Sequence, residues 1–535
     1  MMRSSFHRDR WIALQRCRLS AGVLIVAIWG LAPLLSPRAV AQTNTWWDTN
    51  GNTAGAGTTP IGTWDTNGNN KVWNTDSGGV GSSSTLKAWV NGNNALFSAG
   101  TDATNPFTVT VSGAVTVNNI TFEEGTPTIA GTTLTLTGTS ASTSTITTNS
   151  SGTISAPLAG SGINLTKAGT ATLTFSGSSA NTYSGVTTVN AGELDLNKTA
   201  GINAIAGNLA IGDGTGGSGA DVVKLLTANQ IANSSTVTIN STGKLDLNNN
   251  AETIDGLSGV TGSLATLGSG ALTVGANNGT ANFVGVISGT GGLTKTGSGT
   301  QTLSGANTFS GATTVNAGTL KTTAANALGG TSGITVNNNG SLMLSANNTI
   351  NDAATMTLNG NVTTSNPATK NLVVTGSEGS STDTSATAGL GSLTLQSRST
   401  LDFMQSVNTI VFGQTAGVAF VDSGAFKLDI YNYIGDSTPT GNFDHLVFQQ
   451  DMSTLTGDFE FWNGSSFIDA TAVQLGASSF WEIVPLEPVP EPGTWVAAAL
   501  SLLTIAFSQQ RRFARAIKRV GQPSMFSLNL REKRN

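Results

Sequence analysis

Short strands with one buried side are predicted along most of the chain by its pattern of apolar and polar residues. In residues 165–194, LTKAGTATLTFSGSSANTYSGVTTVNAGEL, apolar residues alternate with Thr or Ser, and the same alternation returns in residues 293–320. A period of two residues is that of a half-buried strand. Gly or Asn interrupts the pattern every four to eight residues. The sequence therefore predicts short strands joined by tight turns.

The segments 165–194 and 293–320 are two copies of one motif. Both contain Leu-Thr-Lys, a connector with Gly, a strand with Leu, and then Asn-Thr-aromatic-Ser-Gly-x-Thr-Thr-Val-Asn-Ala-Gly-x-Leu. A single unit of this kind cannot bury its apolar side alone, so it must stack on a neighbour. We expect an all-β solenoid whose turns of roughly 20 to 25 residues each hold three short strands.

This motif resembles the autotransporter-associated β-strand repeat. The first copy matches it at Leu165, Lys167, Gly169, Leu173, Asn181, Thr182, Tyr183, Gly185, Thr187, Val189, Gly192 and Leu194. The second copy matches it at Leu293, Lys295, Gly297, Gly299, Leu303, Asn307, Thr308, Phe309, Gly311, Thr313, Val315, Gly318 and Leu320. The resemblance implies an exported right-handed parallel β-helix, here over residues 106–395, and it attaches no chemistry to the motif.

Composition agrees with stacked strands. Gly accounts for 66 of the 535 residues, and charged residues make up only 10%. In a parallel stack, equivalent side chains lie about 4.8 Å apart, so like charges would repel along the stack, whereas Thr and Asn can pair. Between residues 42 and 508 there are 28 acidic and 11 basic residues, a formal charge of −17, and Arg398 is the only arginine. This balance argues against nucleic-acid binding, which depends on neutralising phosphates.

Residues 1–41 are predicted to be a secretory signal peptide. An Arg-rich start precedes an apolar run, and Ala39-Val40-Ala41 forms a small-residue cleavage site before Gln42. A retained membrane anchor is the alternative. The only cysteine, Cys17, lies in this leader, so the exported part has no disulfide.

Residues 42–105 are rich in Trp and contain Trp-Asp-Thr-Asn-Gly twice, starting at Trp47 and Trp64. Asn and Gly at these points predict turns with positive φ. Carbohydrate stacking on the rings, or Ca²⁺ binding through Asp48 and Asp65, is one interpretation. We favour a cap that closes the open end of the solenoid.

Residues 396–486 are predicted to be a compact C-terminal β module. Fourteen aromatic residues lie between 401 and 482, whereas six lie between 103 and 400. Such a module would cover the last turn and hide its unpaired strand edge.

The segment 487–519 combines Pro-Glu-Pro, an apolar run from Trp495 to Phe507 and a basic cluster, and a basic tail follows at 520–535. It resembles the PEP-CTERM sorting signal, which implies recognition and removal by an exosortase, a membrane protease-transferase. The residues that carry this resemblance are Val489, Pro490, Glu491, Pro492, Arg511 and Arg512. Thirteen apolar residues span about 20 Å as a helix, less than the hydrocarbon core. A plain tail anchor is the alternative. An autotransporter in its own right is disfavoured, because such proteins end in a membrane barrel.

The sequence predicts no catalytic residue, cofactor or metal site. His445 is the one histidine after the leader, and we expect it at the surface. The carboxylate pairs Glu123 with Glu124 and Asp246 with Asp255 are expected in solvated turns. The run GDGTGG at 212–217 fits a dinucleotide motif formally, but it lacks the βαβ context and is expected to be a turn. We expect a loop or short helix over 220–232.

Two functions remain open. The favoured one is a non-enzymatic structural or adhesive β-helix that an exosortase delivers to the cell surface or extracellular matrix, with polysaccharide or surface proteins as partners. The alternative is a secreted polysaccharide lyase or hydrolase on the same scaffold, which would need paired carboxylates on one outer sheet.

Overall fold

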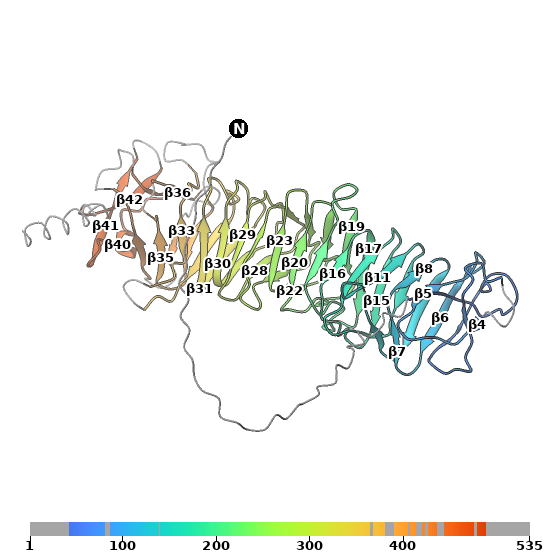
Figure 1. Cartoon of the computed structure of the whole chain (residues 1–535). Coiled ribbons are helices and arrows are strands. Elements are labelled where there is room, and N and C mark those ends of the chain that lie inside the picture. Colours follow the sequence, from blue (N-terminus) through green and yellow to red (C-terminus); the bar gives the residue numbers. More distant parts are fainter. Residues whose placement is uncertain are drawn as a thin grey trace, which may run out of the picture. The chain divides into compact units, whose positions relative to one another are not determined.

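The structure is a computed structural model that describes residues 42–487 except 81–85, 139, 364–366, 380–389, 405–406, 414–419, 423–425, 436–442 and 476–478. All of these residues belong to the unit Gln42–Asn535. The fold is a parallel β-solenoid with almost no helix, as the alternating pattern predicts. Figure 1 shows its strands following one another in chain order from cyan through yellow to orange. The right-handed winding stays a prediction.

Each turn of the solenoid, called a rung here, contributes strands to up to three stacked ladders. These ladders are the three sides of the solenoid and are called faces here. The first face is a parallel ladder that runs from β1 to β40. Its strands are β1 (Asn44–Trp47), β5 (Asn94–Phe97), β8 (Ile120–Phe122), β11 (Thr143–Thr148), β14 (Asn164–Ala168), β16 (Thr187–Val189), β18 (Leu209–Ile211), β20 (Thr236–Ile239), β23 (Gly256–Gly259), β26 (Ala281–Phe283), β29 (Thr300–Leu303), the second halves of β30 (Thr313–Thr322) and β31 (Gly333–Leu344), β33 (Leu372–Val374), β35 (Ser399–Asp402), β38 (Leu428–Tyr431) and β40 (Phe459–Trp462).

The second face is a ten-stranded parallel sheet in its first part. Its strands are β2 (Gly62–Trp64), β6 (Pro106–Val111), β9 (Thr126–Gly131), β12 (Gly152–Ile154), β15 (Leu173–Gly177), β17 (Gly192–Lys198), β19 (Asp221–Leu225), β21 (Gly243–Asp246), β24 (Leu264–Thr266) and β27 (Val286–Ser288). It then narrows to single bridges between Leu328 and Ile350 and between Glu378 and Ile410. It widens again at β36 (Thr409–Phe412) and β39 (His445–Phe448).

The third face starts with three strands and narrows earlier. Its first strands are β7 (Val115–Val117), β10 (Leu134–Leu136) and β13 (Leu158–Ala159). After a bridge between Ile205 and Ile231, the face resumes. Its later strands are β22 (Glu252–Ile254), β25 (Leu272–Val274), β28 (Leu293–Lys295), the first halves of β30 and β31, β32 (Thr355–Asn359), β34 (Leu393–Leu395) and β37 (Phe420–Asp422).

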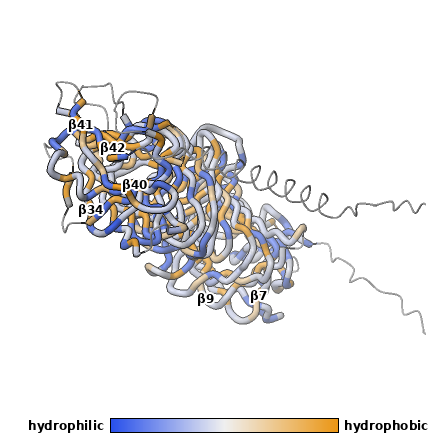
Figure 2. Tube along the Cα trace, turned by 90° about the vertical axis from the view of Figure 1, so that its left-hand side faces the viewer, coloured by the Kyte–Doolittle hydropathy of each residue, from blue (hydrophilic) through white to orange (hydrophobic). Residues whose placement is uncertain are grey.

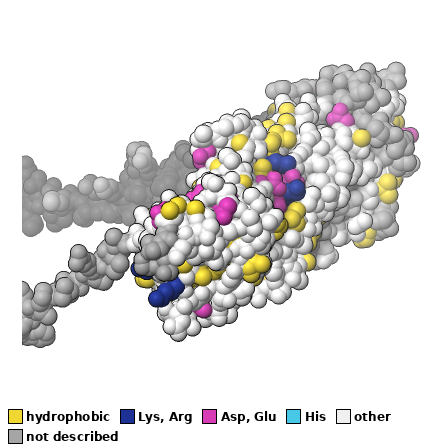
Figure 3. Space-filling view, turned by 90° about the vertical axis from the view of Figure 1, so that its right-hand side faces the viewer, with side chains coloured by type: hydrophobic (Ala, Val, Ile, Leu, Met, Phe, Trp, Pro, Cys, Tyr) yellow, Lys and Arg dark blue, Asp and Glu magenta, His cyan; other side chains and the backbone are white. Residues whose placement is uncertain are grey.

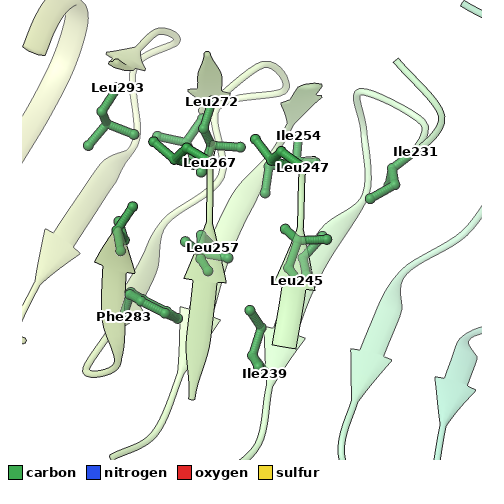
Figure 4. Packing of buried hydrophobic residues seen from close by; sticks show 14 of the residues in the cluster. Ile231, Ile239, Leu245, Leu247, Ile254, Leu257, Leu267, Leu272, Phe283 and Leu293 are labelled. Carbon is green, nitrogen blue, oxygen red and sulfur yellow. The ribbon is translucent and has the colours of Figure 1, made fainter. Parts of the chain in front are cut away.

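The core is the space that the three faces enclose. In most strands, buried and partly exposed positions alternate, so that Leu173 and Phe175 of β15 are fully buried while Thr174 between them is partly exposed. Figure 2 shows this as short orange and blue segments along the trace. Aliphatic side chains of successive rungs, such as Leu272 and Leu293, point into the same interior (Figure 4). Each rung therefore supplies part of the apolar surface that its neighbours bury.

The two ends of the described chain depart from parallel pairing. Near the N-terminal end, β3 (Trp73–Asn74) pairs antiparallel with β1 and with β4 (Leu86–Lys87). Near the C-terminal end, the short helix η1 (Thr456–Asp458) precedes β40. There β41 (Phe467–Gln474) and β42 (Trp481–Pro485) form an antiparallel pair that joins β40 on one side and β39 on the other.

One predicted element is wrong. The segment 220–232 was expected to be a loop or short helix, but residues 221–225 form strand β19, whose Asp221, Val223 and Leu225 are buried. The strands β17 and β21 pair with β19 on both sides, and this ladder decides the local structure in place of the helix-like spacing of its apolar residues. As predicted, residues 212–217 lie outside strands, with positive φ at Gly212 and Gly214.

Candidate functional site

The lysine of the repeated motif lies inside the solenoid in both copies. Lys167 is 1% exposed and occupies an inward position of β14, in register with Val189 of the next rung. Its Nζ donates to the carbonyl oxygens of Ala168 at 3.3 Å, Gly169 at 2.6 Å and Ala191 at 2.8 Å. The last of these carbonyls belongs to the following rung, so the side chain ties two rungs together at one corner.

The second copy repeats this arrangement. Lys295 is 0% exposed and lies in register with Val315. Its Nζ donates to the carbonyls of Thr296, of Gly297 at 2.8 Å and of Ala317 in the next rung at 3.2 Å. The connectors around both lysines need glycine: Gly169 and Gly297 have φ of 79° and 61°, a region that other residues adopt with strain.

Burial opposes the charge of these lysines, whereas their hydrogen-bond partners favour it. Burial lowers the pKa of Lys167 and of Lys295 to about 8 in each case, and the charges of Asp221 and Asp255, respectively, oppose that shift. Three carbonyl acceptors match the three N–H donors of an ammonium group, and a neutral amine has only two. Either way, a buried Nζ with all its donors used cannot meet a ligand from outside.

The asparagine of the motif bridges three rungs in both copies. Asn181 accepts the N–H of Leu158 in the preceding rung at 2.9 Å and donates to the carbonyl of Ala204 in the next at 2.8 Å. Asn307 does the same with Ile287 at 2.8 Å and Ala327 at 2.7 Å. Each asparagine is 2% exposed. The side chain thus replaces a strand at the point where one face narrows.

The contacts between rungs that each asparagine begins continue into the following rungs, and in both copies they end at a buried glutamate. After the first copy, the N–H groups of Gln230 and Ile231 donate to Glu252 Oε2 at 2.8 and 3.3 Å. After the second copy, the N–H of Thr349 donates to Glu378 Oε1 at 2.8 Å, and that of Ile350 to Oε2 at 3.3 Å. Burial raises the pKa of both carboxyl groups to about 7, although the hydrogen bonds they accept oppose the shift.

The two copies of the motif lie on different faces. Lys167 is on the first face and Asn181 at the narrow part of the third, whereas Lys295 is on the third face and Asn307 at the narrow part of the second. The second copy is therefore displaced by one face around the solenoid. The same sequence thus presents its outward residues on different sides of the molecule, while its buried lysine and asparagine make the same contacts.

One group of outward charged side chains lies on the second face. Asp195, Lys224 and Asp246 are in register on β17, β19 and β21, so that opposite charges alternate along the stack. Lys224 Nζ lies 3.8 Å from Glu193 Oε1, and Lys244 Nζ lies 2.8 Å from Asp246 Oδ2. Figure 3 views the molecule from one side, where Lys or Arg and acidic side chains lie together among mainly uncharged atoms.

Asp195 is the member of this group whose carboxyl group is best suited to acid–base chemistry. Burial, reinforced by the neighbouring carboxylate of Glu193, raises its pKa to about 7, and the charge of Lys224 opposes the rise. A carboxyl group with a pKa near neutrality can serve as a general acid, and glycoside hydrolases use pairs of carboxylates.

Two surface pockets of about 260 and 280 Å³ lie away from this group of charges, one beside Phe467 and Leu486 and the other beside Asn338 and Pro367.

His445 was expected at the surface, and this prediction is wrong. It is 8% exposed, and its Nδ1 lies 2.7 Å from Glu482 Oε1 across the antiparallel strands β39 and β42. Its neighbour Asp444 is fully buried and accepts the N–H groups of Asn408 at 2.9 Å and Ile434 at 2.6 Å. The C-terminal antiparallel strands cover the histidine, which the local pattern FDHLVF could not indicate.

Arg398 is occupied by acidic partners. Its Nε lies 2.9 Å from Asp429 Oδ2, and its Nη2 lies 3.0 Å from Glu460 Oε2, which Lys427 also contacts through the other oxygen. The guanidinium lies over the ring of Phe467 at 5.2 Å. A lyase that uses arginine would need this group to face its substrate, and here two carboxylates bind it.

Residues 165–196 and 293–321 match the passenger-associated-transport-repeat. A part of the chain of 187 residues, 35% of its length, is 36% identical to the adhesin BmaC autotransporter of Brucella suis biovar 1 (strain 1330). That alignment corresponds to 5% of the adhesin, so the chain spans only a small part of its length. No solved structure matches the chain.

The passenger-associated-transport-repeat thus marks the segments whose polar residues are buried in the structure. The repeat and the similarity to an autotransporter adhesin support the resemblance to the autotransporter-associated repeat that the sequence indicates. The lysine and the asparagine of the repeat match the family motif in sequence, but their burial was not predicted. The signal was present: in Leu-Thr-Lys, a period of two places the lysine on the same side as the buried leucine.

The other predicted positions do not converge on a site. Asp48 is fully buried, and its carboxylate accepts from Asn74 at 2.8 Å and from the backbone of Asn50. Asp65 instead accepts the N–H of Asn67 in an exposed turn. Over the described ranges, no group of three or more His, Cys, Asp or Glu residues could hold a metal ion.

The predicted carboxylate pairs are also separate. Glu123 accepts from Asn149 and Glu124 from Ser98. Asp246 lies outward on β21, whereas Asp255 is 9% exposed and accepts the N–H groups of Asn277 and Gly279. The expectation of a solvated turn is therefore wrong for Asp255, which stabilises a turn of the next rung.

The predicted signal residues lie outside the described part of the chain. These are the cleavage residues Ala39 and Ala41 and the sorting residues Val489, Pro490, Glu491, Pro492, Arg511 and Arg512. Within the described residues, the structure contains no helix with the length and apolar character needed to cross a bilayer. The signal peptide and the sorting signal therefore stay predictions.

Proposed function

We propose that this chain is an exported, non-enzymatic β-solenoid that acts as a structural adhesive at the cell surface or in the extracellular matrix. The observation that carries the proposal is the use of the repeat residues. The polar groups of Lys167 and Asn181, and of their equivalents Lys295 and Asn307, form hydrogen bonds between rungs. The repeat builds a scaffold, and contact with a partner is left to the outer faces.

The two ends of the solenoid are proposed to be capped. Trp64 is fully buried, and its ring centroid lies 5.2 Å from that of Trp73 and 4.9 Å from that of Trp89. At the other end, the antiparallel strands β41 and β42 pair with β40 and β39. The antiparallel strands occupy strand edges that would otherwise invite end-to-end association. The domain limits at 105, 395 and 486 belong to this proposal, although the first-face ladder runs across the first two.

Delivery by an exosortase-type protease is the proposed route. It is supported by the sequence alone: Pro490-Glu491-Pro492, the apolar run 495–507 and the basic residues Arg511 and Arg512. In this route the chain is anchored transiently in the inner membrane, with its basic tail on the cytoplasmic side, before removal of the tail. Mass spectrometry of the mature termini tests it. We expect a start at Gln42 and an end close to Pro492, and an intact tail would contradict it.

Adhesion is tested on cells that export the full chain. The cells are compared with a deletion strain and with a strain that carries the deletion and a restored gene, in an assay of attachment to polysaccharide-coated and protein-coated surfaces. We expect loss of attachment in the deletion strain and recovery on restoration. Equal attachment in all three strains would contradict the adhesive function.

A polysaccharide hydrolase is the second candidate, and the carboxyl pair Asp195 and Glu193 is the observation in its favour. Purified full chain is assayed on neutral and acidic polysaccharides, together with the variants Asp195→Asn and Glu193→Gln. The adhesive proposal predicts no turnover by any of them. Turnover that Asp195→Asn abolishes would establish the hydrolase instead.

A further inference from the structure

Seven threonines form one continuous column on the outside of the third face, called the threonine ladder here. The strand register places each directly beside the next across β22, β25, β28, β30, β31, β32 and β34: Thr253, Thr273, Thr294, Thr314, Thr335, Thr357 and Thr394. All seven are partly exposed. Neighbouring strands lie about 4.8 Å apart, so the ladder extends over about 29 Å.

The hydroxyl groups of the ladder are free. Within the described residues, none of the seven Oγ1 atoms takes part in a hydrogen bond. Inward threonines of the same strands behave differently: Thr313 Oγ1, beside Thr314, lies 3.0 Å from Thr331 Oγ1. The inward hydroxyl groups of Thr313 and Thr331 are thus paired, whereas the regular row of outward hydroxyl groups is left unused.

The columns on both sides of the ladder carry no exposed charge. On one side lie the small residues that precede each strand position by two: Ala251, Ala271, Gly292, Ala312, Gly333, Thr355 and Ser392. On the other side, Asn337 donates to Asn316 at 2.8 Å, and Asn359 donates to Asn337 at 3.3 Å. The carboxylate of Asp255, also on this side, is buried and bound to backbone N–H groups. The result is a flat strip of methyl, hydroxyl and amide groups.

The chemistry of this strip selects among partners. Protein interfaces draw most of their energy from aromatic or arginine anchors, and the strip has none. Nucleic acids and anionic lipids require basic residues, which are also lacking there. A row of free hydroxyl groups with one fixed spacing fits a partner that repeats its own hydroxyl groups along a line.

We propose that the threonine ladder binds a neutral, linear polysaccharide laid along the stack of rungs. This inference rests on the proposed adhesive function and names the chemistry of its partner. Each rung contributes one weak hydroxyl contact together with its methyl group, and the affinity comes from their number, because contacts along one polymer act as a multivalent set. The absence of exposed charge on the strip makes the binding insensitive to salt and disfavours polyanionic chains.

The other faces carry shorter ladders, which supplies a matched control. On the second face, Thr128, Thr153 and Thr174 are in register and point outward, but the next positions along the stack are Asp195 and Lys224. A neutral polymer lying there would meet charged groups after a few contacts. Substitutions in this control column change the same residue type in the same strand context without touching the threonine ladder.

Binding of the purified full chain to two insoluble neutral glucans, cellulose and curdlan, tests the proposal. The variant Thr294→Val/Thr314→Val/Thr335→Val removes three central hydroxyl groups and keeps the side-chain shape, and valine is well tolerated in strands. We expect its affinity to fall about tenfold or more. The variant Thr294→Ser/Thr314→Ser/Thr335→Ser keeps the hydroxyl groups and should bind within about threefold of the native chain. The control Thr128→Val/Thr153→Val/Thr174→Val should bind like the native chain.

Several results would overturn the proposal. They are failure of the native chain to bind either glucan, equal binding by the valine variant with an unchanged circular dichroism spectrum, and stronger, salt-sensitive binding to polygalacturonate. If cells that export the native chain still attach while the valine variant attaches equally well, the ladder is refuted and the adhesive function stands. If the exporting cells show no attachment advantage over the deletion strain, the adhesive function itself fails.

Discussion

The variant Lys167→Met tests whether burial or hydrogen bonding governs the charge of the repeat lysine. Methionine keeps the apolar stem and removes Nζ. Burial lowers the pKa of Lys167 to about 8 in the folded chain, against 10.5 for the free side chain. Between these two values the unfolded state binds more protons than the folded state, so the free energy of unfolding rises with pH.

The size of this effect follows from the two pKa values. Each pKa unit corresponds to about 1.4 kcal/mol, so one lysine contributes a rise of about 3 kcal/mol between pH 8 and pH 10.5. Below pH 8 the lysine is charged in both states, and its contribution no longer changes with pH. The difference in free energy of unfolding between the native chain and Lys167→Met should therefore shift in favour of the native chain by an amount that grows steadily above pH 8.

Urea unfolding followed by far-ultraviolet circular dichroism, at several pH values from 7.5 to 9.5, measures this difference. Lys71→Met is the control, because Lys71 is exposed. We expect Lys71→Met to follow the native pH profile. For Lys167→Met, the slope of the free energy of unfolding against pH should be lower than that of the native chain by up to about 1.4 kcal/mol per pH unit. Parallel profiles for the native chain and Lys167→Met would show that the three carbonyl acceptors keep the ammonium charged, and would refute the argument from burial.

Three further changes test the polar corners and the tryptophan cluster. Asn181→Ala leaves a buried N–H and a buried carbonyl without partners and should cost about 2–4 kcal/mol in urea unfolding, while the exposed Asn69→Ala should be neutral. Trp64→Ala removes a fully buried ring and should cost about 3–5 kcal/mol; a loss below 1 kcal/mol would speak against its burial. Glu378 has a pKa of about 7 in the fold, against 4.5 for the free side chain, so its contribution is present below pH 4.5 and is lost as the pH rises through 7. Glu378→Gln should remove this loss in pH-dependent thermal melts, and an unchanged profile would contradict it.

The alternation of apolar and polar residues was sufficient to predict the solenoid. Strands such as β15 and β28 lie where Leu173 and Leu293 begin an alternating run, and the glycines after the lysines have the positive φ that such turns need. A period of two identifies the buried side of a strand without any knowledge of its neighbours. Stacking on a neighbour then follows, because a single unit cannot bury that side alone. The parallel direction of the strands was implied by the resemblance of the motif to the autotransporter-associated repeat.

Features that depend on contacts between distant rungs could not be predicted in this way. The burial of His445 arises from β42, which follows it by more than thirty residues, and the strand at 221–225 arises from the ladder between β17 and β21. The displacement of the second repeat copy by one face is set by how many strands each intervening rung contains. The threonine ladder likewise becomes visible only when the register of seven strands is known.

Amine labelling of the native chain tests most directly the central claim that the repeat builds the scaffold from inside. The chain is treated with an amine-reactive reagent before and after denaturation, and the labelled lysines are identified by mass spectrometry. The structure predicts that Lys167 and Lys295 stay unlabelled in the native chain, react after denaturation, and contrast with the exposed Lys71. Labelling of Lys167 and Lys295 in the native chain as fast as Lys71 would place the repeat lysines on the outside and contradict the account.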